Sequence, residues 1–527
     1  MKLAARIVCV MFLGVALSAQ ADDAASASIY GFIEGRIDSV TGTLRPDAML
    51  LPDEPAGRRY SRIRWVPGAL EGLGTRHMKW DGSEKASRAA GLIELVANGN
   101  VAAEEALYEM LRADDVVTFY SDALDFAASR ARSAEPVLHA MALRFATESA
   151  DRGPVKFGIA MLGSFGGERD LPVVQMLALH DEFGLYAAEA IAEMAPDRQR
   201  ALYEMARKLK GWGRIEAVSR MVATSDPELR RWLLTEGFRN NVTPQYLAYQ
   251  CVTIANLSGA LADLDPKAKP DLPLLTGASD LLQALIEPGP AAGMGRYEDA
   301  PQATEAFLVN VRKRRESVSF YLAAAAIREY VSTLSNAPAT DANSRDVALA
   351  HWTPEQQREV TALATNIVND SSWHRHVVAA LASETVALDQ ADAAAQKLGI
   401  KTFKLHLDQL KKHPANAHRW ELAFAAAEPD DVKRLVEIAQ RASGTALEAV
   451  LRGVARYPGS GMTLLETSLA DGDAGVRRAA VETLIRWGNA YLRDVSVRSA
   501  LHNAARDEHD EALKARMVAL LNLATLP

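Results

Sequence analysis

Asp473-Ala-Gly-Val-Arg-Arg-Ala-Ala-Val-Glu-Thr-Leu-Ile-Arg-Trp487 is the stretch from which the fold of this chain is predicted. Counted from Val476, a set of mostly apolar residues falls at offsets 0, 3, 4, 7, 8 and 11, which places it in one stripe along an α-helix. Asp473 stands at the expected N-cap, where a carboxylate accepts hydrogen bonds from free backbone N–H groups. Gly488 then stops the helix. The stretch predicts a helix that must bury its apolar stripe against neighbours.

This arrangement recurs along the chain. Residues 462–470 are expected to form a partner helix that turns at Asp471-Gly472, giving a helical hairpin of about 30–40 residues. Polar or acidic turns open comparable helices over residues 151–162, 180–194, 226–234, 369–381 and 507–521. One hairpin cannot bury its stripe alone, so the hairpins must stack on one another. The length of the chain then predicts roughly twenty helices.

On these motifs the chain resembles proteins built from HEAT-type repeats, whose second helix commonly begins with an acidic turn followed by Val-Arg and small apolar residues. The resemblance implies that Val476 is a core residue and that Arg477 ties neighbouring repeats together through an acidic turn residue. The spacing between copies is irregular. We therefore predict an all-α fold, an irregular α-solenoid of HEAT-like helical hairpins with a non-repetitive N-terminal cap segment.

Composition agrees with a helical globular protein and excludes several functions. The 527 residues are 49% hydrophobic and 24% charged, which excludes wholesale disorder. Aromatic residues make up only 6%, which favours closely packed helices over sheets. The net charge of −8 disfavours binding to nucleic acid. Two cysteines exclude a disulfide framework and a cysteine-based metal site, and we predict neither a cofactor nor a metal.

Residues 1–21 predict a secretory signal. Lys2 and Arg6 provide a positive start, residues 7–17 form a short apolar core, and Ala19-Gln20-Ala21 fits the cleavage pattern of signal peptidase. The apolar core is too short to span a bilayer, and no later run is long enough, so no integral membrane segment is expected after cleavage. The sequence therefore predicts a periplasmic or secreted protein.

Four parts follow the predicted signal. Frequent Gly and Pro make residues 22–83 an irregular N-terminal cap segment, in which residues 30–33 and 63–66 are predicted as strands or extended strips. Residues 84–262 and 303–527 are predicted as two helical-repeat blocks. Residues 263–302 are rich in Pro and Gly and are predicted as a linker or loop, either a hinge or a loop packed on the solenoid.

The cap segment carries the candidate partner-binding residues, which are Arg58, Arg59, Arg62, Arg64, Trp65 and Trp80. Guanidinium groups interleaved with aromatic rings suit the recognition of carboxylates or of an acidic protein face. The structural alternative is that these arginines bridge the segment to the acidic first helices, at Glu104, Glu105 and Glu109.

These features favour a non-catalytic function, in which a concave helical surface holds a protein partner, as an envelope scaffold or as an antidote to an exported toxin. The alternative is a periplasmic hydrolase with a His/carboxylate site assembled between repeats. That alternative predicts that His374, His413 and His418 converge with acids in a deep pocket where pKa values are shifted.

Overall fold

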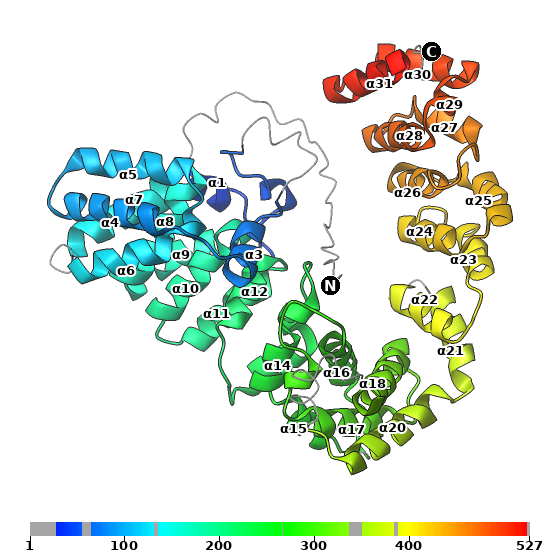
Figure 1. Cartoon of the computed structure of the whole chain (residues 1–527), viewed down its shortest axis with the longest axis horizontal. Coiled ribbons are helices and arrows are strands. Elements are labelled where there is room, and N and C mark those ends of the chain that lie inside the picture. The colour runs from blue at the N-terminus through cyan, green and yellow to red at the C-terminus, as the bar shows by residue number, and fades with distance from the viewer. Residues whose placement is uncertain are drawn as a thin grey trace. The chain divides into compact units, whose positions relative to one another are not determined.

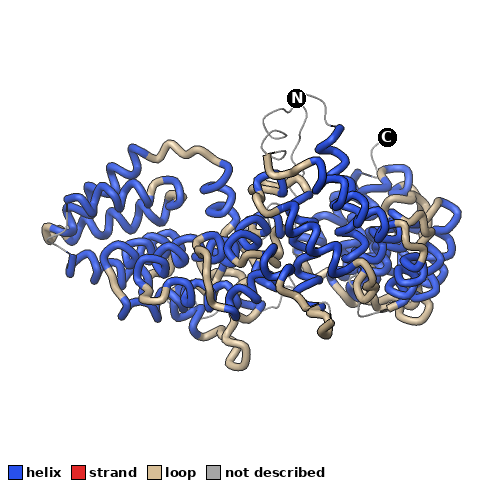
Figure 2. Tube along the Cα trace, turned by 90° about the horizontal axis from the view of Figure 1, so that it is seen from below, coloured by secondary structure: helices blue, strands red, loops and turns tan. Residues whose placement is uncertain are grey.

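The computed structural model describes residues 28–54, 65–130, 135–265, 267–336, 350–383 and 388–523. Within these ranges the chain has 29 α-helices, and its β structure is one isolated bridge between Ile37 and Leu44. Figure 2 shows the helices joined by loops and turns. The all-α prediction is confirmed. The expectation of roughly twenty helices is too low, because many described helices have fewer than ten residues. None of the described helices is both long and apolar enough to cross a membrane. The signal predicted over residues 1–21 lies outside the described ranges.

Helix contacts divide the chain into two compact units. The first comprises Met1–Asn310 and Ile327–Thr361, and the second comprises Val311–Ala326 and Ala362–Pro527. Three helices cross the division, namely α17 (Ala300–Val311), α18 (Val318–Asn336) and α20 (Pro354–Val368).

The other α-helices of the first unit are α1 (Ile29–Glu34), α3 (Ala69–His77), α4 (Ser83–Ala97), α5 (Val101–Ala113), α6 (Tyr120–Arg130), α7 (Glu135–Glu148), α8 (Arg152–Phe165), α9 (Leu171–Leu177), α10 (Gly184–Met194), α11 (Arg198–Lys208), α12 (Trp212–Ser219), α13 (Pro227–Trp232), α14 (Ala248–Ile254), α15 (Leu257–Ala262) and α16 (Leu272–Ile286). Two of its short 3-10 helices matter below, η5 (Asp181–Phe183) and η7 (Pro244–Tyr246).

The other α-helices of the second unit are α21 (Ser372–Ala382), α22 (Leu388–Lys397), α23 (Phe403–Leu410), α24 (Ala417–Ala426), α25 (Val432–Ala439), α26 (Gly444–Val454), α27 (Met462–Ser468), α28 (Ala474–Trp487), α29 (Asn489–Leu492), α30 (Val495–Asp507) and α31 (Glu511–Leu523). In Figure 1, helical pairs such as α23–α24, α25–α26 and α27–α28 follow one another in chain order along this unit.

The stretch at 473–487 folds as its pattern predicts. Asp473 caps α28 by accepting hydrogen bonds from the backbone N–H groups of Gly475 and Val476. Val476, with Ala480 and Leu484, is fully buried in one continuous core that extends from α23 to α31. The local signals in this sequence therefore determine where the helix begins and which face it buries.

Contacts between successive helical pairs measure the repeat length. Toward the end of the second unit these contacts include Arg452–Glu421 (31 residues apart), Thr483–Leu451 (32) and Arg477–Glu508 (31). In the first unit they include Arg144–Glu104 (40 apart), Arg220–Glu189 (31), Arg200–Glu228 (28) and Arg231–Asp271 (40). The helical pairs are therefore regular over the end of the chain and irregular in the first unit.

The predicted secondary structure of the cap segment is wrong at residues 30–33, which lie in α1 and form no strand. Ser28 caps this helix by accepting from the Gly31 N–H, and Ile29 and Ile33 bury one side of it. Two isoleucines four residues apart suit a helix face as well as a strand, and here tertiary burial decides between the two.

Residues 263–302, predicted as a linker or loop, contain the buried 15-residue helix α16. Pro273 lies in the first turn of α16, where its missing N–H and fixed φ are tolerated, and Asp271 caps the helix. Gly277 lets α16 approach the backbone closely, because a Cβ there would lie 2.0 Å from the Leu234 carbonyl oxygen. Proline and glycine therefore serve as a helix start and a packing contact in this segment.

Arg477 links two helical pairs and gives a first testable prediction. Its guanidinium donates to both carboxylate oxygens of Glu508, at 2.8 and 2.9 Å, and these hydrogen bonds lower the pKa of Glu508 to about 2. Arg477→Ala is expected to lower the free energy of unfolding by about 2 kcal/mol, measured by urea denaturation. Arg478→Ala is the matched control, since its contact with Asp510 is a single longer one of 3.4 Å. That variant should lose less than about 0.5 kcal/mol, and equal losses would contradict the prediction.

Candidate functional site

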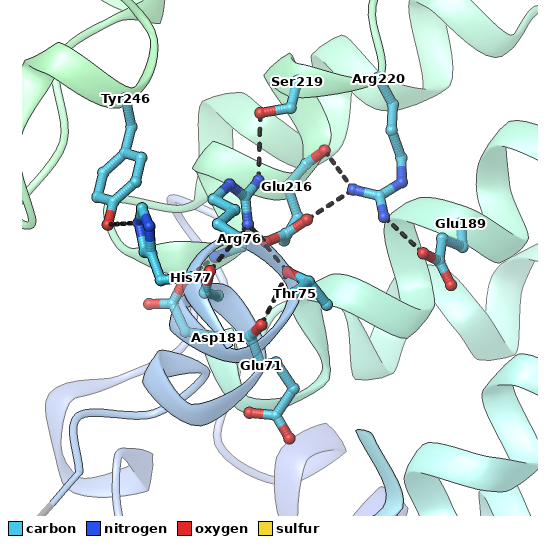
Figure 3. Close-up of polar contacts among 12 residues, drawn as sticks. Glu71, Thr75, Arg76, His77, Asp181, Glu189, Glu216, Ser219, Arg220 and Tyr246 are labelled. Carbon is cyan, nitrogen blue, oxygen red and sulfur yellow. Dashed lines mark hydrogen bonds and ion pairs between the residues drawn. The ribbon is translucent and has the colours of Figure 1, made fainter. Parts of the chain in front are cut away.

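The main cluster of buried charged groups in the first unit lies where α3 packs on the helices behind it. Figure 3 shows Arg76 directed toward Glu216 and His77 directed toward Tyr246, with Glu71 on another side of the helix. We call the surface under α3, formed by residues of α8, η5, α12 and η7, the α3 seat. Every residue of this seat belongs to the first unit.

Lys156 of α8 occupies the buried end of the seat. Its Nζ donates to Glu71 Oε1 at 2.5 Å and to Glu182 Oε1 at 2.7 Å. Burial opposes the charged ammonium, but the charges of Glu182 and Glu71 outweigh it and raise the pKa of Lys156. The two carboxylates differ: burial raises the pKa of Glu71, whereas Lys156 and Arg152 overcome burial and lower the pKa of Glu182 to about 2.

Arg152, one turn before Lys156 on α8, holds the part of the cap segment that precedes α3. Its guanidinium donates to Asp53 at 2.8 and 2.9 Å and to Glu54 at 2.7 Å. The i, i+4 spacing places Arg152 and Lys156 on the same face of α8. One helix face therefore binds carboxylates from two places in the cap segment.

Arg76 occupies the outer end of the seat. It forms an ion pair with Glu216 of α12, and its guanidinium lies 5.9 Å from the ring centroids of both Trp212 and Tyr246. Glu216 also accepts from Arg220 at 2.6 Å. Ionic and cation–π contacts therefore act together on the Arg76 side chain.

Two neighbouring acid–base groups lie in η5 and just before it. Burial raises the pKa of Asp181 to about 6, although its Oδ1 accepts from the Gly213 N–H at 2.7 Å. Burial lowers the pKa of His180 to about 4. Both shifts favour the uncharged form, as expected for groups removed from water.

The raised pKa of Asp181 gives a second prediction. The folded state holds this proton more tightly than the unfolded chain, whose ordinary value is 3.8, so stability is lost as the pH rises from about 4 through 6. Relative to Asp181→Asn, which does not titrate, the wild-type protein is expected to lose about 2–3 kcal/mol between pH 4 and pH 7.5. Urea denaturation across this range measures the difference, and a difference that does not vary with pH would contradict the prediction.

Two of the six predicted partner-binding residues lie in the described part of the chain. Arg58, Arg59, Arg62 and Arg64 lie outside the described ranges. Trp65 and Trp80 flank α3 and are 55% and 39% exposed. Of the acids proposed to receive the arginines, Glu104 pairs with Arg144 of α7 and Glu109 with Arg112 of its own helix.

The histidines of the hydrolase hypothesis lie at different places in the second unit. His374 is an exposed residue of α21, and His413 lies in the turn before α24. His418 of α24 lies 2.9 Å from Asp389 and 3.5 Å from Glu421 in ion-pair geometry. Among the described residues, no three His, Cys, Asp or Glu side chains are placed to hold a metal ion.

Sequence reasoning missed Glu71, Lys156, Glu182 and Glu216. One signal was present for Lys156, which is the single charged residue between positions 153 and 165 in an otherwise apolar stretch. The ammonium of a lysine at that position must either pair with buried carboxylates or reach solvent.

Comparison with known proteins adds little to these observations. No protein-family profile matches the chain, and no curated protein matches it. A solved structure similar to it is described as "Circular tandem repeat protein with novel repeat topology and enhanced subunit contact surfaces". The two are 16% identical, the likeness covers 84% of this chain and 94% of that chain, and the TM-score is 0.13. The assignment to the all-α, repeat-like class therefore rests on the helices of this chain.

Proposed function

We propose that this is an exported, non-catalytic helical scaffold of the HEAT-repeat type that binds a protein partner through its N-terminal cap segment. The proposal rests on the position of the large apolar side chains that are exposed to solvent. In the described part of the chain, six of the exposed large apolar side chains lie between residues 28 and 80. They are Val40, Met49, Leu50, Trp65, Met78 and Trp80.

The chemistry of these side chains supports binding to a protein. Tryptophan, methionine and arginine are enriched at protein interfaces, and tryptophan is frequent among residues that carry most of the binding energy. Trp65 directly follows the arginine-rich stretch that begins at Arg58. A partner that offers an apolar surface with acidic residues around it would complement both features. The ion pair between Arg477 and Glu508 supports the HEAT-type assignment, since it joins neighbouring helical pairs as that resemblance implies.

Capture from the producing cells tests this proposal. The tagged full-length chain is cross-linked in the cell envelope as wild type, as the double variant Trp65→Ser/Trp80→Ser, and as Val495→Ser. Val495 is 83% exposed in the second unit and serves as the matched control. We expect wild type and Val495→Ser to recover the same partner and the double variant to recover at least tenfold less. Equal recovery by all three, or no partner with wild type, would overturn the proposal.

A separate measurement tests the proposed export. Fractionation of the cells, followed by N-terminal sequencing, should find the protein outside the cytosol and beginning at Asp22. Intact protein beginning at Met1 in the cytosol would overturn the proposed localisation without affecting the partner-binding surface.

A further inference from the structure

We propose that α3 is an intramolecular ligand, and that the α3 seat is a second interaction surface that accepts a partner helix with the pattern Glu-Gly-x-x-x-Arg. In this chain the pattern is Glu71-Gly72-Leu73-Gly74-Thr75-Arg76. The inference goes beyond the proposed function, because it concerns the surface beneath α3 and not the exposed side chains around it.

The first argument is that α3 has little tendency to be a helix by itself. It has nine residues, of which two are glycines, and its N-cap is Gly68 with φ +75°. Each internal glycine lowers helix stability relative to alanine, and isolated helices shorter than about 12–15 residues are marginal in water. Contact with the seat and with the 3-10 helix η2 (Val116–Thr118) must therefore maintain the helix, as binding does for a peptide that folds on its partner.

The second argument is that the seat keeps its charges paired without α3. Lys156 retains Glu182 at 2.7 Å, and Glu216 retains Arg220 at 2.6 Å, which in turn pairs with Glu189 at 2.7 Å. Departure of α3 would therefore leave none of these seat charges without an oppositely charged neighbour. A preformed and electrostatically satisfied surface is what a binding site for a separate chain requires.

The third argument is that the contacts in the seat require three features of any helix that binds there. A carboxylate must reach Lys156, and a guanidinium must reach Glu216 beside the rings of Trp212 and Tyr246. The residue after the carboxylate must be glycine, since a Cβ at position 72 would lie 1.9 Å from a ring carbon of Trp212. These demands define the Glu-Gly-x-x-x-Arg pattern.

The fourth argument is that the contact between α3 and the surface beneath it leaves buried polar atoms without hydrogen bonds. Glu71 Oε2 and the hydroxyl of Tyr186 are both buried without a hydrogen-bond partner in the part of the chain that the structure describes. Burial, followed by the charge of Glu71, raises the pKa of Tyr186. A buried polar atom without a partner weakens a complex. A partner helix whose own carboxylate is fully hydrogen-bonded, and which also pairs with the Tyr186 hydroxyl, would bind more tightly than α3 and displace it.

Peptide binding to the full-length chain tests the inference. The probe is a fluorescein-labelled peptide of residues 67–79, which contains the pattern but neither tryptophan, so its outcome is independent of the capture experiment above. The receptor is Gly72→Leu, which expels α3 from Trp212 and leaves every seat charge in place. Gly91→Leu is the matched control, because no atom of the described residues lies within 4 Å of a Cβ at Gly91 on α4.

We expect fluorescence anisotropy to show at least tenfold tighter binding to Gly72→Leu than to wild type or Gly91→Leu. Peptides carrying Arg76→Ala or Gly72→Leu should lose this binding. Arg76→Glu in the full chain is a second way to release α3, should Gly72→Leu fail to fold by circular dichroism. If no folded variant binds the peptide more tightly than wild type, α3 is a fixed part of the fold and the inference is overturned.

Discussion

Replacing Lys156 with methionine is expected to lower the free energy of unfolding by about 3–5 kcal/mol, because Glu71 and Glu182 then share a buried site without their ammonium. Methionine is unbranched and of similar length, so the loss reflects charge more than volume. Both carboxylates accept from Lys156 within 2.7 Å, and the lysine side chain is only 8% exposed. Urea denaturation monitored by circular dichroism measures the effect.

Two further variants separate this electrostatic explanation from a general loss of packing. Adding Glu71→Gln to Lys156→Met removes the carboxylate charge that has lost its ammonium partner and should restore at least about 1 kcal/mol. Lys208→Met, at an exposed position of α11, should change stability by less than about 0.5 kcal/mol. If Lys156→Met behaves like Lys208→Met, the buried ion cluster does not stabilise the first unit.

The difference between Lys156 and Asp473 shows what the sequence could reveal. Asp473 caps residues two and three positions away, so its role could be predicted from adjacent letters. Lys156 contacts Glu71 and Glu182, which lie 85 and 26 residues away. Periodicity and capping are local properties of the chain, whereas the pairing of buried charges depends on how the helices pack.

The cap segment and residues 263–302 show a second limit of sequence reasoning. In both, frequent glycine and proline predict interruptions of helical structure. At Pro273 and Gly277 they allow a helix to begin and to approach its neighbour closely. At Gly72 the missing side chain makes room for Trp212, 140 residues further along the chain. The residue type indicates an unusual backbone or packing requirement at each of these positions, but only the packed structure shows which contact imposes it.

Gly153→Ala is expected to destabilise the first unit by about 3–4 kcal/mol, through a steric clash between two helices. A Cβ at position 153 would lie 1.9 Å from the carbonyl oxygen of Leu111, and a backbone oxygen cannot rotate away as a flexible side chain can. To relieve the contact, α8 must move away from α5, and the displacement would disturb Arg152 and Lys156, which lie on the same helix. Thermal and urea denaturation measure the loss.

Gly91→Ala is the matched control for this variant, since it makes the same substitution in the helix α4 at a place where no described residue comes within 4 Å of the added methyl group. It should raise the free energy of unfolding by about 0.5–1 kcal/mol, because alanine restricts the unfolded chain and favours the helix. The two substitutions are chemically identical, so opposite signs can arise only from the space around each glycine. Equal effects would mean that α5 and α8 do not approach each other as closely at Gly153 as the structure places them.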